Sequence, residues 1–123
     1  MKRWLFLLMM LPITVVAQLT TSSQSPGSLV QNVLLGPGVT VSNIFYTGSA
    51  NAIGYFSAPN TNLGINEGIV ITTGTINAGG SGPQGPNDSP NSGVDNNMGG
   101  YNPLTALIGG TPTKNAAVLE FDF

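Results

Sequence analysis

The chain has 123 residues, which is room for at most one domain. It contains no cysteine and no histidine, so disulfides, thiol nucleophiles, imidazole bases and Cys/His zinc sites are excluded. After residues 1–17, one cation, Lys114, stands against five carboxylates, a net charge of −4. Nucleic-acid binding needs clustered Lys and Arg, so no nucleic-acid partner is expected.

The first segment, "MKRWLFLLMMLPITVVAQ", has the three parts of a secretory signal peptide. Lys2 and Arg3 form a basic start, an apolar run follows, and Val15-Val16-Ala17 offers small residues before Gln18. The alternative is a transmembrane anchor, but the apolar run is shorter than the about 20 residues that a span needs. The sequence therefore predicts a signal peptide over residues 1–17, a secreted or cell-surface product, and no membrane span after cleavage.

The start of the mature chain predicts a flexible leader followed by a short helix. Residues 18–27 are rich in Thr, Ser and Gln and are expected to be the leader. In residues 28–35, Ser28 can cap a helix, apolar residues recur four apart, and Gly36-Pro37 ends it. A strand over the same residues is the alternative, because Val is common there.

Short strands separated by turn residues dominate the rest of the chain. Strands are expected over 39–47, 51–58 and 67–74. The third is nearly all apolar and is therefore expected to be covered on both faces of its sheet. Gly54, in the second, could mark a bulge. A short helix is expected over 103–110, with Pro103 at its start. The final "NAAVLEFDF" alternates apolar and acidic residues, which indicates a half-buried strand. The fold class predicted is mainly β with one or two short helices.

Residues 77–100 form a Gly-, Pro- and Asn-rich segment that predicts a long surface loop. Its Gly80–Gly85 stretch matches G-x-G-x-x-G, but the nearby prolines prevent the helix that a dinucleotide site needs. Calcium is the most plausible metal, because it takes carboxylate and amide oxygens. Asp88 and Asp95 are the weak calcium candidates, and a plain loop is the alternative. No other cofactor is predicted.

Two further groups of residues, a pair of carboxylates and a set of aromatics, could form a site but also have simple structural roles. Glu120 and Asp122 could be a glycosidase carboxylate pair, but a solvated strand face is the favoured interpretation. A sparse set of aromatics could form a sugar-binding face, although core or rim packing is the commoner role. These aromatics are Tyr46, Tyr55, Phe56 and Tyr101. No catalytic residue is predicted, and the segment is not expected to be an enzyme.

Several stretches, taken in order, resemble the choice-of-anchor L domain. They are "LVQNVLLGPGVTVSNIFYTGSANAIGYFSA", "TNLGINEGIVITTGTI", "GPN", "LTALIGG" and "NAAVLEFDF". The resemblance covers residues 28–123 and implies a predominantly β domain, incomplete here and β-sandwich or jelly-roll-like. One departure is Tyr101–Thr105, where relatives often carry acidic residues, and it weakens the calcium prediction.

The family occurs near the N-terminus of large exported surface proteins of gram-negative, often gliding, bacteria. The resemblance implies a non-catalytic surface module of an adhesin-like or gliding-associated protein, with an extracellular ligand such as a glycan or a surface protein. The alternative is the accessory part of a secreted hydrolase whose catalytic domain lies downstream. Because family members continue through more strands, residues 28–123 are expected to be an N-terminal part in which Phe121 and Phe123 lack partner strands. Alone, such a part is expected to fold poorly.

Overall fold

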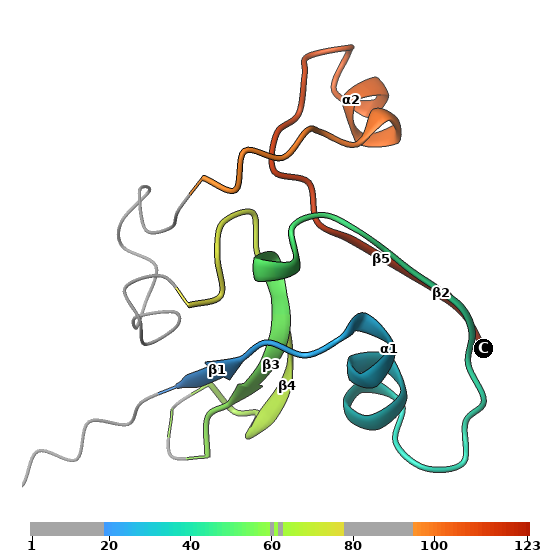
Figure 1. Ribbon diagram of the computed structural model, residues 1–123, viewed down its shortest axis with the longest axis vertical. Helices are drawn as coiled ribbons and strands as arrows, with labels where there is room; N and C mark the ends of the chain where they lie inside the picture. The colour runs from blue at the N-terminus through green and yellow to red at the C-terminus, as the bar shows by residue number, and fades with distance from the viewer. Residues whose placement is uncertain (1–18, 60, 62, 78–94) are drawn as a thin grey trace, which may run out of the picture.

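Two antiparallel sheets and three short helical segments make up the computed structural model, which describes residues 19–59, 61, 63–77 and 95–123 (Figure 1). One sheet has the strand order β1-β3-β4 and the other pairs β2 with β5. The strands are β1 (Thr20–Ser22), β2 (Ser42–Thr47), β3 (Ile53–Ser57), β4 (Glu67–Ile71) and β5 (Val118–Asp122). The helical segments are α1 (Pro26–Ser28) continuing into the π-helical η2 (Leu29–Leu34), the 3-10 turn η3 (Ala50–Ala52), and α2 (Asn102–Leu107). The mainly β prediction is confirmed.

The three-stranded sheet is centred on β3, which is the most buried strand. Ile53 is fully buried and Phe56 is 7% exposed, whereas the flanking strands are half-buried or exposed. β3 pairs in continuous register with β4, from Ile53 opposite Ile71 to Ser57 opposite Glu67. A strand with neighbours on both edges is shielded along its length, which is why the β-branched and aromatic residues of β3 supply much of the core.

Gly54 marks a close approach between strands rather than the bulge that the sequence could indicate. Its register with Val70 is regular. A Cβ atom added to Gly54 would lie against the side chain of Ile76 and 2.5 Å from the backbone oxygen of Ser22 in β1. The bulge lies in β2 instead, between Ser42 and Phe45. A residue without a side chain at position 54 therefore lets β1 and the segment after β4 pack over β3.

The core lies between the helical segment and the three-stranded sheet. η2 contacts both β3 and β4, and α1 contacts β2 of the other sheet, so this segment touches both sheets (Figure 1). Its Leu29 and Val30 are fully buried. The other buried apolar residues are Ala52, Ile53, Phe56, Ala58 and Ile76. Burying a large aliphatic side chain contributes about 1.5–3 kcal/mol, so this small set supplies much of the stability of the described residues.

The helix predicted over 28–35 is present, and the strand alternative is wrong. It begins two residues earlier, because the Ser25 hydroxyl caps it by accepting from the Ser28 backbone N–H at 3.2 Å and Pro26 occupies the first turn. The predicted apolar face is only partly buried, since Leu34 is 51% exposed. Helix capping by Ser25 thus replaces the capping by Ser28 that the sequence indicated.

Two further expectations need correction. The segment 18–27 was expected to be a leader, but Thr20–Ser22 forms β1 and pairs with β3, from Thr20 opposite Ser57 to Ser22 opposite Tyr55. The strand over 67–74 is shorter, and β4 is not covered on both faces. Glu67 and Ile71, which lie on the same face of β4, are exposed, and β4 is also an edge strand within the described residues. Sequence periodicity does not report which strand lies at the edge of a sheet.

The helix predicted over 103–110 is confirmed as α2, which lies on an excursion away from both sheets (Figure 1). Pro103 is in its first turn, and Gly109 and Gly110 end it with φ angles of 72° and 84°. Two backbone hydrogen bonds close the base of the excursion, from Asn115 N to Met98 O at 3.0 Å and from Ala116 N to Gly99 O at 3.3 Å. The chain therefore returns directly into β5.

Candidate functional site

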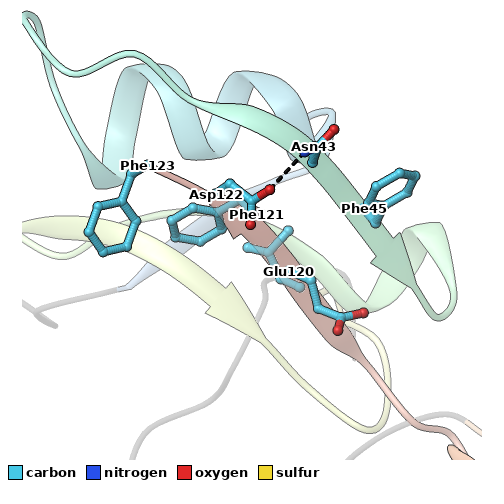
Figure 2. Close-up of a pocket in the computed structure, with 7 residues that line it drawn as sticks. Asn43, Phe45, Glu120, Phe121, Asp122 and Phe123 are labelled. Carbon is cyan, nitrogen blue, oxygen red and sulfur yellow. Dashed lines mark hydrogen bonds between the residues drawn. The ribbon is translucent and has the colours of Figure 1, made fainter.

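An open hollow of about 650 Å³ lies along β5 and the neighbouring end of β2 (Figure 2). Five consecutive residues of the final stretch, 119–123, line it together with Asn43 and Phe45 of β2. Successive residues of a strand point to opposite faces, so a hollow lined by five in succession follows the strand itself and not one face of the sheet.

The alternating sequence of β5 gives the hollow two kinds of wall. Glu120 and Asp122 are exposed on one face, whereas Leu119 and Phe121 are half-buried on the other. This confirms the solvated strand face that the sequence offered for the two carboxylates. Phe45 of β2 lies directly opposite Glu120 in the register and therefore shares its face. The hollow thus combines apolar rings with two carboxylates.

Aromatic rings at this site are unusually open to solvent. Phe123 is 91% exposed and Phe45 is 66% exposed. The rings of Phe121 and Phe123 lie near each other, with centroids 6.2 Å apart and tilted by 45°, and Phe45 lies at the other end of the hollow (Figure 2). Exposed apolar side chains gathered around a hollow mark an interaction site more often than isolated ones do.

The β2 bulge positions the carboxylate of Asp122. Asn43 adopts a left-handed conformation with φ of 49°, which Asn tolerates better than most residues. Its side-chain amide donates to Asp122 Oδ2 at 2.7 Å, across the two strands (Figure 2). Sequence analysis did not single out Asn43 or Phe45, because their role depends on the pairing of β2 with β5, which lie far apart in the sequence.

Of the two calcium candidates, Asp88 lies outside the described residues and Asp95 lies at the base of the α2 excursion. Asp95 Oδ1 accepts from the Asn115 side-chain amide at 2.9 Å and from the Asn97 backbone N–H at 2.8 Å. In the described part of the chain no three His, Cys, Asp or Glu residues gather where they could hold a metal. The contacts of Asp95 are those of a side chain that fastens residues 95–97 to Asn115.

These hydrogen bonds lower the pKa of Asp95 below its ordinary value of 3.8. The bond from Asn115 is the main cause, followed by the Asn97 N–H, and the charge of Lys114 acts in the same direction. Because the folded-state pKa is the lower one, the stabilising contribution of this carboxylate is complete above pH 3.8. It is lost as the pH falls through the lowered folded value.

We expect Asn115→Gly to raise the pKa of Asp95 towards 3.8, because this change removes the amide donor. Asn115 has a φ of 51°, which glycine adopts without strain. The measurement is an NMR titration of the Asp95 carboxyl carbon. Asn43→Gly is the matched control. It also replaces an Asn with a left-handed backbone, but the side-chain amide that it removes is bonded to Asp122 and not to Asp95. An Asp95 pKa that is equal in the parent and in Asn115→Gly would contradict the claim that the Asn115 amide lowers it.

The aromatic residues considered for a sugar-binding face do not share one. Tyr55 and Phe56 are neighbours in β3 and point to opposite faces, and Phe56 belongs to the core. Tyr46 lies in β2 and its hydroxyl donates to the Ser49 backbone oxygen at 2.9 Å, whereas Tyr101 precedes α2. The Tyr55 hydroxyl donates to the Glu67 carboxylate at 2.5 Å, which raises the pKa of Tyr55. The Gly80–Gly85 stretch lies outside the described residues.

Comparison with protein families gives a match to the choice-of-anchor L domain over residues 16–123. The chain belongs to this family. The match spans both sheets and α2, and it confirms the resemblance drawn from the sequence. Searches of curated proteins and of solved structures found no match.

Membership of the choice-of-anchor L family indicates a surface-associated module that acts outside the cell. The family is one of non-catalytic surface modules and implies an exported or surface protein. In the described residues, no helix combines the length and the apolar character needed to cross a membrane. The hollow along β5 lies on the surface of a choice-of-anchor L domain.

Proposed function

We propose that this choice-of-anchor L domain is a non-catalytic binding module of a larger adhesin-like or gliding-associated surface protein. The observation that carries the proposal is the family match over residues 16–123, and the hollow along β5, where Phe45 is exposed beside two carboxylates, supports it. The absence of any histidine or cysteine in the whole sequence supports a binding role over acyl transfer or zinc chemistry.

An in-frame deletion of residues 18–123 in the producing bacterium tests the role. We expect the deletion to reduce attachment of cells to a surface, or their gliding speed, while the rest of the protein is still exported. Phe45→Ala in the intact protein is the finer variant, because this side chain is 66% exposed and its loss leaves the described core intact. Normal attachment and gliding by the deletion strain would overturn the proposal.

Export through a cleaved signal peptide is part of the same proposal. We expect Edman sequencing or mass spectrometry of the secreted or cell-surface protein to place Gln18 at its N-terminus. The physical reason is the small-residue exit Val15-Val16-Ala17 after the apolar run. Replacing Ala17 by Arg should block cleavage and leave the precursor at the inner membrane. A mature protein that still begins at Met1 would contradict the proposal.

A further inference from the structure

β1 begins very close to the bond at which the signal peptide is expected to be cut. The expected cut lies between Ala17 and Gln18, and β1 starts at Thr20. An extended chain advances by at most about 3.6 Å per residue, so Gln18 and Leu19 keep the cut within about 7 Å of the paired strand. The expected processing site and a strand of the three-stranded sheet are therefore neighbours.

Pairing with β3 fixes the backbone at the start of β1 (Figure 1). Thr20 lies opposite Ser57, the last residue of β3. Continuing this register by one residue places Leu19 opposite Ala58. The burial of both residues agrees with that placement, since Leu19 is half-buried and Ala58 is 1% exposed. The packed part of the chain thus reaches the residue next to Gln18.

Contacts outside the strand pairing also hold β1 in place. The Thr21 hydroxyl lies 2.9 Å from the backbone oxygen of Ile76 and 2.8 Å from Asn77 Oδ1, and its one proton is donated to one of these two acceptors. The Ser22 backbone oxygen packs so closely over Gly54 that a Cβ atom there would lie 2.5 Å away. All of these contacts lie within residues 19–77, so they are independent of what covers β5.

A peptidase needs the residues around its scissile bond in an open, extended form. Endoproteases hold the residues on both sides of that bond as an extended segment in a cleft, much as an added strand binds to the edge of a sheet. They cut most readily where the backbone is exposed and free of hydrogen bonds. In the fold, Thr20 already pairs with Ser57. One segment cannot fill the cleft of a peptidase and pair with β3 at the same time.

We propose that residues 18–22 have two mutually exclusive uses, first as the segment that the signal peptidase holds after the cut and then as β1. Cleavage precedes the pairing of β1, and that pairing closes the processing site. A precursor that folds before it is cut therefore resists the peptidase. The inference rests on the proposed function only in requiring a signal peptide that is cleaved after Ala17.

The test incubates the intact precursor with signal peptidase in detergent micelles, in two samples with the same final urea concentration. One sample is folded beforehand, and the other is diluted out of concentrated urea directly into the peptidase. We expect the folded sample to be cut at least about 10-fold more slowly, because cutting then waits for β1 to open. A spacer of about eight Gly and Ser residues between Gln18 and Leu19 should abolish the difference, since it moves the cut away from β1.

A substitution under β1 tests whether its opening controls the cut. Gly54→Ala places a methyl group against the Ser22 backbone oxygen, so it favours the open form of β1. The folded precursor with this change should be cut about 5-fold faster than the folded parent, or more. Gly99→Ala is the matched control, because a Cβ atom there meets nothing within 4 Å, and it should leave the rate unchanged.

Three results would overturn the proposal. They are equal cleavage of the folded and the urea-diluted precursor, equal rates for Gly54→Ala and Gly99→Ala, and a folded precursor that is cut as slowly with the spacer as without it. Mass spectrometry of the products separates these results from failure of the proposed function. A urea-diluted precursor that is not cut after Ala17 would overturn the cleaved signal peptide, and this inference with it.

Discussion

Replacing Leu29 by Ala is expected to lower the free energy of unfolding by about 2–5 kcal/mol, the largest effect of any single substitution considered. Leu29 is fully buried in η2, and η2 contacts both β3 and β4. Truncation removes three carbon atoms and leaves a cavity that the short sheet cannot close fully. Because folded domains are stable by only about 5–15 kcal/mol, the variant should lose a large part of its native population.

Urea denaturation of the mature protein, followed by circular dichroism, measures this loss. Leu34→Ala is the matched control, since it changes the same residue type in the same helical segment at a position 51% exposed. We expect the control to stay within about 0.5–1 kcal/mol of the parent. Similar losses in the two variants would mean that η2 does not pack against the sheet as described.

Gly54→Ala is expected to destabilise the protein by about 1–3 kcal/mol, the range for an overpacked core. The new methyl group would meet the Ser22 backbone oxygen at 2.5 Å and the Ile76 side chain. A backbone atom cannot turn aside as a side chain can, so β1 must move away from β3. The loss should therefore be concentrated in β1, and hydrogen exchange should show faster exchange of its amides.

Gly99→Ala serves as the control for this substitution, because a Cβ atom there meets nothing within 4 Å and its carbonyl hydrogen bond is retained. It should leave both the midpoint of unfolding and the exchange of the β1 amides unchanged. Equal stability of Gly54→Ala and Gly99→Ala would indicate that β1 does not lie over Gly54.

Local chemistry accounts for the elements that could be predicted correctly. Pro103 and the Gly109-Gly110 pair bound α2 by fixing or freeing the backbone at single residues. The alternation of Leu119, Glu120 and Phe121 indicates a strand with one half-buried face, and β5 has it. These signals act within a few residues, so they can be read without knowing what packs against them.

Other features depended on contacts across long stretches of chain. Thr20–Ser22 is polar and carries no apolar alternation, yet it becomes β1 because β3 has a free edge beside Gly54. The bulge at Asn43 and the exposure of Phe45 follow from how β2 meets β5. The contacts of Asp95, a weak calcium candidate from the sequence, are with Asn97 and Asn115 in the described residues, and its binding of calcium stays a prediction.

Composition and local pattern by themselves determined the classes of chemistry open to this protein, its mainly β character and its family resemblance. The absence of cysteine and histidine, and the spacing of the apolar residues, can be determined without knowing how the chain folds. The tertiary structure alone decided which strands became edges and which apolar residues stayed exposed. Pairing between β2 and β5 brings residues about 75 positions apart into one hollow, and no local preference encodes a contact over that distance.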